Sequence, residues 1–174
     1  MKSLLFALAF LPLTALATPS TAAESRAMGP DAQHQFLVGL SGTWSVKQSL
    51  WLTAGQPPKL DTGTAEFSMV LNGRHLRQDL KIDDGTGFEG LGYLGYDTAS
   101  GQFFSTWMDV NFPGLVVAYG GFDAPAKAYV LNGSMAGIPV RDVLTVTDTD
   151  HFRYAYYETR NGTEALTVQL DYSR

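Results

Sequence analysis

Polar residues with the chemistry of a small-molecule site alternate with apolar residues in the middle of the chain. In residues 74–82, Arg74 and Gln78 share the phase of the apolar side chains, so both are expected to point to the buried side of a strand. A buried Arg needs a charged partner, because an unpaired buried charge is costly. Arg74 therefore either joins an internal polar network or binds a ligand carboxylate or phosphate through two hydrogen bonds.

Neighbouring segments supply the other candidates. Glu89 and Asp109 are the carboxylates nearest to Arg74 in the expected strand order, so either is a candidate partner for it. Whether Glu89, Tyr93, Trp107 and Asp109 point inward depends on the phase of their strands. The predicted ligand-binding residues are Gln48, Arg74, Gln78, Glu89, Trp107 and Asp109.

Patterns for metal binding and nucleophilic catalysis are weak. The spacing of His34, His75 and His151 does not bring them together, and the chain has no cysteine. No His-x-x-x-His or Glu-x-x-His pair and no Gly-x-Ser-x-Gly elbow occurs. No metal site, cofactor or catalytic residue is therefore predicted.

An alternation of apolar and polar residues organises most of the chain, beginning at Gly42-Thr43-Trp44. A short helix over 31–40, capped by Asp31, is expected before it. Strands are expected at 43–52, 63–71, 74–82, 87–96, 102–110, 115–122, 127–131, 141–147, 151–159 and 165–172. Turn signals about 8–12 residues apart predict an all-β fold, an antiparallel up-and-down barrel of about 8–10 strands.

Four Asn-Gly or Asp-Gly pairs are the expected hairpin turns, at Asn72, Asp84, Asn132 and Asn161. Aromatic residues crowd the second half of the chain, where they fit either a packed core or the wall of a pocket. They are Tyr119, Phe122, Tyr129, Phe152, Tyr154, Tyr156 and Tyr157.

The first residues have the pattern of a secretory signal peptide. A positive start is followed by an apolar run and by Ala15-Leu16-Ala17, a cleavage signal of small residues. We expect a signal peptide over 1–17, a disordered linker over 18–30 and one domain over 31–174, in a periplasmic or secreted protein. The net charge of −5 argues against nucleic acid as a partner, and no segment is long and apolar enough to span a membrane.

Several segments resemble a bacterial family of exported domains of unknown function. They are His-Gln-Phe-Leu at 34–37, Asn-Gly-Arg-His-Leu-Arg-Gln at 72–78, Phe-Glu-Gly-Leu-Gly-Tyr-Leu-Gly-Tyr-Asp at 88–97, Phe-Ser-Thr-Trp-Met-Asp at 104–109 and Tyr-Ser-Arg at 172–174. Gly42-x-Trp44 also resembles the opening motif of lipocalins. This resemblance implies a lipocalin-like, calycin-type barrel whose Trp44 plugs one end under a basic residue from near the C-terminus. Arg174 has the phase to be that residue.

We expect a monomer or weak dimer that binds a small apolar or amphipathic molecule in the barrel, entering at the end opposite Trp44. One alternative is an enzyme with an acid or base at the barrel mouth, for which Glu89, Asp109 and His75 are candidates. The other is a structural or interaction module with a filled interior. A cavity of about 300 Å³ or more would favour ligand binding.

Overall fold

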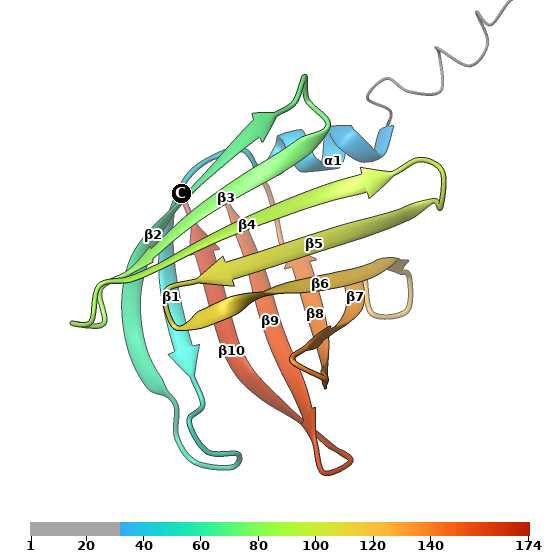
Figure 1. Ribbon diagram of the computed structural model, residues 1–174. Coiled ribbons are helices and arrows are strands. Elements are labelled where there is room, and N and C mark those ends of the chain that lie inside the picture. Colours follow the sequence, from blue (N-terminus) through green and yellow to red (C-terminus); the bar gives the residue numbers. More distant parts are fainter. Residues whose placement is uncertain (1–31) are drawn as a thin grey trace, which may run out of the picture.

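A computed structural model describes residues 32–174, which form one closed antiparallel β-barrel with a short helix (Figure 1). The expected signal peptide, the linker and the capping residue Asp31 lie outside the described residues. The elements are α1 (Ala32–Leu40), β1 (Gly42–Leu50), β2 (Lys59–Val70), β3 (His75–Ile82), β4 (Phe88–Asp97), β5 (Gln102–Asp109), β6 (Phe112–Asp123), β7 (Ala128–Met135), β8 (Ile138–Val146), β9 (His151–Arg160) and β10 (Thr163–Ser173).

Each strand pairs with its neighbours in the chain, and β1 pairs with β10 to close the barrel. In that last pairing Val46 lies opposite Tyr172 and Gln48 opposite Leu170. Closure leaves no strand edge unpaired, which removes the template for edge-to-edge aggregation. The predicted all-β up-and-down barrel is therefore confirmed.

The alternation seen in the sequence places the core inside the barrel. Trp44 and Val46 in β1 are buried while Thr43, Ser45 and Lys47 are exposed. The same phase continues around the wall, because paired residues on adjacent strands project to the same side of a sheet. The buried core includes Phe67, Leu76, Leu80, Phe103, Leu131, Phe152, Leu170 and Tyr172.

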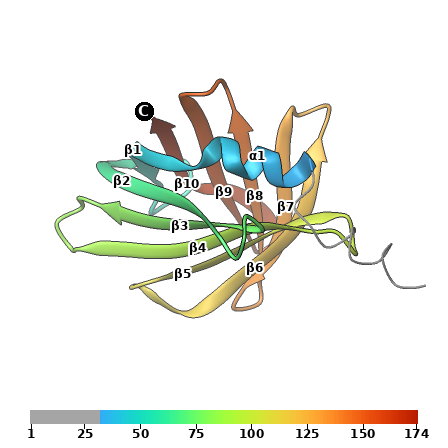
Figure 2. The same ribbon diagram turned by 90° about the horizontal axis from the view of Figure 1, so that it is seen from above.

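One end of the barrel is covered by α1, which Figure 2 shows lying across it. Leu37 and Leu40 of α1 are buried, and the Phe36 ring stacks on Tyr129 of β7 with 4.0 Å between ring centroids. Beneath the helix, the Trp44 indole is 1% exposed and donates a hydrogen bond from Nε1 to the Leu40 carbonyl oxygen at 2.9 Å. The helix and the first strand therefore pack together as one closed end.

Arg174 completes this end from the other terminus of the barrel. Its Cζ lies 4.1 Å from the centroid of the Trp44 ring, and its Nη1 donates to the Ser41 carbonyl oxygen at 2.8 Å. Nη2 donates to the Thr149 carbonyl oxygen in the β8–β9 turn at 2.6 Å. One side chain thus ties together the first strand, the last strand and a turn between them.

The expected turn at Asn132-Gly133 is wrong, because both residues lie inside β7 and the chain turns at Ala136-Gly137. Ala136 and Gly137 have φ of 49° and 84°, the left-handed values that a tight hairpin turn requires. Gly133 instead lies against Ala118 of β6, where a Cβ would overlap the Val117 carbonyl oxygen. This glycine is needed for close approach between strands.

Pro113 and Gly114 were expected before the sixth strand but belong to β6, which begins at Phe112. Similarly, β2 begins at Lys59, four residues before the expected start at Gly63, and extends the wall toward the open end. Among residues 32–174, the structure contains no helix with the length and apolar character needed to cross a membrane.

Candidate functional site

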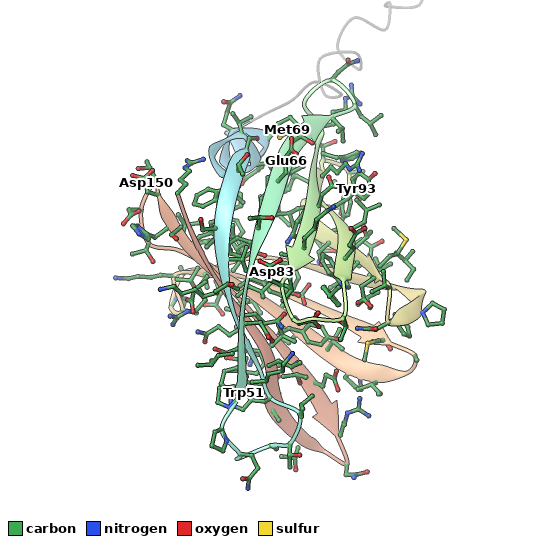
Figure 3. All side chains as sticks on the ribbon, turned by 90° about the vertical axis from the view of Figure 1, so that its left-hand side faces the viewer. Trp51, Glu66, Met69, Asp83, Tyr93 and Asp150 are labelled. Atoms are coloured by element: carbon green, nitrogen blue, oxygen red, sulfur yellow. The ribbon has the colours of Figure 1, made fainter. Side chains whose placement is uncertain are left out.

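The half of the barrel away from α1 encloses a cavity of about 490 Å³. Figure 3 labels Trp51 at this open end, and Met69 and Asp150 toward the end that α1 covers. Most of the cavity wall is apolar or aromatic, including Leu50, Phe67, Leu80, Phe88, Trp107, Phe112, Val116, Leu144 and Val168. Ligand pockets in proteins have this character and typically measure about 300–1,000 Å³.

Four of the six predicted ligand-binding residues line this cavity: Gln48, Gln78, Trp107 and Asp109. Gln78 of β3 donates from Nε2 to the Tyr172 hydroxyl of β10 at 2.9 Å, across 94 residues of sequence. Burial raises the pKa of Tyr172, so its phenol stays protonated over the physiological range. Whether any of these residues binds a ligand stays a prediction.

Trp107 lies flat against the wall because β4 has glycines beneath it. Gly90 and Gly92 pair with Asp109 and Trp107, and a Cβ built on Gly90 would overlap the indole ring. The indole Nε1 donates to Asp109 Oδ2 at 2.8 Å, while Asp109 Oδ1 accepts from the backbone N–H groups of Asn111 and Phe112. The glycine-rich strand thus makes the slot in which this tryptophan is held.

Arg74 does not point into the barrel, as the sequence had suggested. It lies in the β2–β3 turn, outside β3, which begins at His75. Leu71, Asn72 and Gly73 all have positive φ, so the turn is one residue longer than Asn-Gly alone implies and the strand phase does not extend back to Arg74. Its side chain borders a separate hollow beside α1.

Glu89 is also misplaced in the prediction, since it lies on the outer face of β4. Its Oε1 forms an ion pair with Lys81 Nζ at 3.0 Å, and both side chains are mostly exposed. Tyr93 has the same outward phase, because it alternates with Gly92 and Leu94 and pairs with Thr106. The proposed Arg74–Glu89 and Arg74–Asp109 partnerships therefore do not form inside the barrel.

The most deeply buried carboxyl group in the cavity is Asp142 of β8, which the sequence analysis missed. Its side chain is 6% exposed; Oδ2 accepts from Ser105 Oγ at 2.7 Å and Oδ1 accepts from the Tyr154 hydroxyl at 2.9 Å. Burial raises the pKa of Asp142, although both hydrogen bonds act in the opposite direction. Burial and the nearby Asp142 raise the pKa of Tyr154 well above its ordinary value.

Ser105 reaches Asp142 across two intervening strands because both strands carry small residues at that level. Ser105 pairs with Ala118 of β6, and Ala118 pairs with Gly133 of β7. Leu131 of β7 pairs directly with Asp142, but Ala118 and Gly133 leave room beside it, and the hydroxyl and the carboxylate meet inside the barrel. The sequence signal was present: Asp142 shares the inward phase of Val140 and Leu144 in an alternating segment.

Tyr156 and Glu158 extend this polar group along β9. The Tyr156 hydroxyl contacts Met135 Sδ at 3.5 Å, and Glu158 Oε2 accepts from Arg160 Nε at 2.7 Å. Burial, followed by the proximity of Glu158, raises the pKa of Tyr156. Of the aromatic residues predicted to be core or pocket wall, Phe152, Tyr154 and Tyr156 line the cavity and Tyr129 packs against the core, whereas Tyr119 and Phe122 are exposed.

Two of the three histidines come together, which the spacing did not predict. His34 of α1 and His75 of β3 border the same hollow as Arg74 and Tyr96, a space of about 310 Å³ outside the barrel interior. His151 is elsewhere, with its Nδ1 2.9 Å from Asp148 Oδ1 in the β8–β9 turn. Within residues 32–174, no three side chains of the His, Cys, Asp or Glu type converge as a metal site would require.

The family of proteins of unknown function designated DUF1579 matches residues 29–174. The chain belongs to DUF1579. The sequence resemblance to a family of unknown function is thereby confirmed, and no curated protein sequence matches the chain.

A solved structure shares the fold of this DUF1579 chain. The S-type phycobiliprotein lyase CPES from Guillardia theta has a TM-score of 0.56 and 10% sequence identity, covering 89% of this chain and 98% of the lyase. At that identity the likeness extends to the fold alone. The cavity of the DUF1579 barrel must therefore be interpreted from its own residues.

Proposed function

We propose that this protein binds a small, largely apolar molecule inside its barrel. The observation that carries the proposal is the cavity of about 490 Å³, which has apolar walls and a few placed polar groups. Its closed end is sealed by α1, Trp44 and Arg174, so the ligand enters between the loops of the opposite end.

The two alternatives have less support from the geometry. A module with a filled interior would not retain a cavity above the 300 Å³ scale of ligand pockets. For an acid or base at the mouth, Glu89 and His75 do not line the cavity, which leaves only Asp109 of the three candidates. That carboxylate already accepts hydrogen bonds from an indole and two backbone N–H groups.

Export is the second part of the proposal, and it is supported by the leader pattern in residues 1–17. Expression of the full chain in a Gram-negative host, followed by N-terminal sequencing of the periplasmic protein, tests it. Processing near residue 18 is expected. A full-length protein that stays in the cytoplasm would count against export but not against ligand binding.

Ligand binding is tested by native mass spectrometry of the purified protein and by displacement of the neutral apolar dye N-phenyl-1-naphthylamine. Val116 lines the cavity, and its neighbour Val117 has the outward phase of β6. Val116→Phe should weaken dye binding by about tenfold or more, because it fills ligand space, whereas Val117→Phe should leave it unchanged. A wild-type protein that carries no small molecule and binds no dye would overturn the proposal.

A further inference from the structure

The ionisable side chains that line the cavity are carboxyl groups and phenols. The carboxyl groups belong to Asp84, Asp109, Asp142 and Glu158, and the phenols include Tyr154 and Tyr156. Among residues 32–174, no Lys, Arg or His lines this space. A ligand with an anionic head group would lose its hydration and meet groups of its own sign, which is costly.

Two cations stand near the mouth, but each already has a carboxylate partner. Arg160 pairs with Glu158 at 2.7 Å and Lys59 pairs with Asp61 at 3.1 Å. The Arg160 and Lys59 side chains are 61% and 43% exposed, and neither residue borders the cavity. They neutralise carboxylates at the rim and provide no interior site for an anion.

Among the cavity carboxylates, Asp142 alone is both deeply buried and hydrogen-bonded only by neutral donors. Glu158 has Arg160, Asp84 accepts from Thr86 in an exposed loop, and Asp109 accepts from an indole and two backbone N–H groups. Asp142 has only the hydroxyls of Ser105 and Tyr154. A carboxylate in this setting is stabilised by any cation that reaches it, since charge-assisted hydrogen bonds are strong in a desolvated site.

The wall beside Asp142 is also suited to a cation. Tyr154 and Tyr156 come from the adjacent β9 strand, and Trp107 lies in the same cavity. The faces of Tyr and Trp rings attract ammonium groups electrostatically. We propose that the ligand is an amphipathic amine whose ammonium group is bound by Asp142, with its apolar part against the cavity wall. This inference rests on the proposed function and narrows it to one class of ligand.

The test compares three ligands of equal chain length that differ only in the head group: decylamine, decanol and decanoic acid. Each is titrated into the purified protein at neutral pH, below its micelle concentration, by dye displacement and by calorimetry. Decylamine should bind about tenfold or more tightly than decanol, because one charge-assisted hydrogen bond is added. Decanoic acid should bind most weakly.

Two variants then locate the preference. Asp142→Asn should remove the advantage of decylamine over decanol and leave decanol binding within about twofold of wild type. Glu66→Gln is the matched control, because it removes one negative charge from an exposed position on the outer face of β2. It should leave the order of the three ligands unchanged.

The outcomes separate the two proposals. If none of the three ligands displaces the dye and no small molecule co-purifies, binding in the barrel itself fails. If decanol and decanoic acid bind as tightly as decylamine, the barrel binds ligands but the amine assignment is overturned. The assignment is also overturned if Asp142→Asn folds, binds decanol and keeps the amine preference. Should that variant fail to fold, the wild-type comparison still decides the ligand class.

Discussion

The guanidinium of Arg174 stacks on the indole of Trp44, with 4.1 Å from Cζ to the ring centroid. Arg174 is the last residue of the chain and Trp44 lies near the start of the first strand. The contact therefore joins the two strands whose pairing closes the barrel. It also covers the buried ring from the solvent side, at the end that α1 covers.

Replacing Arg174 with Ala should lower the free energy of unfolding by about 1–3 kcal/mol, from the lost cation–π contact and the hydrogen bonds to Ser41 and Thr149. Urea unfolding measures the change. Arg153→Ala is the control, since it removes a half-exposed arginine paired with Asp171 and should cost about 0–1 kcal/mol. Equal free energies of unfolding for Arg174→Ala and wild type would show that the Arg174 contacts do not stabilise the fold.

Asp142 should give the protein an unusual pH dependence of stability. Because burial raises its pKa in the folded state, the folded protein binds this proton more readily than the unfolded chain. Protonation of Asp142 therefore stabilises the folded protein. The free energy of unfolding rises as the pH falls from above the raised pKa of the folded state to the ordinary pKa of the unfolded chain. Tyr154 and Tyr156, which line the cavity beside it, have raised pKa values and stay neutral throughout this range.

Other carboxyl groups have the opposite effect, because the pKa values of Asp84, Asp97, Asp148 and Glu164 are lowered in the fold. The effect of Asp142 is thus measured as the difference in the free energy of unfolding between wild type and Asp142→Asn. The free energy of unfolding of wild type should rise relative to that of the variant as the pH falls from 8 to 4, measured by urea unfolding. A difference that stays constant across this range contradicts the prediction.

Gly90→Ala should displace Trp107, since the added Cβ would overlap the indole. We expect a loss of about 1–3 kcal/mol in the free energy of unfolding and a shift in tryptophan emission. Gly121→Ala is the matched control, because a Cβ there meets no atom within 4 Å. If the two variants unfold alike, the slot that Gly90 makes for Trp107 is not required.

The hydrogen bond between Gln78 and Tyr172 should show coupling in a double-mutant cycle. Tyr172→Phe leaves the half-buried Gln78 amide without its acceptor and should cost about 1–2 kcal/mol. Adding Gln78→Leu to that variant should cost little more, because both polar groups are then gone. Strictly additive losses in the unfolding free energy would mean that the two groups do not interact.

Local patterns predicted most of the strands and, where the alternation is clear, the side of the strand that is buried. Trp44 with Val46, and Leu76 with Gln78, show why: in a strand the side chains alternate, so two residues of known character set the phase of the rest. The errors came where the chain leaves that regularity. Extending the strand phase through the turn before His75 misplaces Arg74, and Asn132-Gly133 lies inside β7 although that pair is common in hairpin turns.

The sequence by itself determined an all-β chain of about 8–10 strands, an N-terminal helix and an Arg174 in phase with the last strand. It also determined Gln78 as an inward polar group, because phase is a local property, and left Trp107 and Asp109 as candidates. Only the tertiary structure decided that Asp142, Ser105 and Tyr154 meet, since they come from three strands and the small residues Ala118 and Gly133 lie between. How the ten strands close around the interior decides whether a cavity remains and which charged side chains line it.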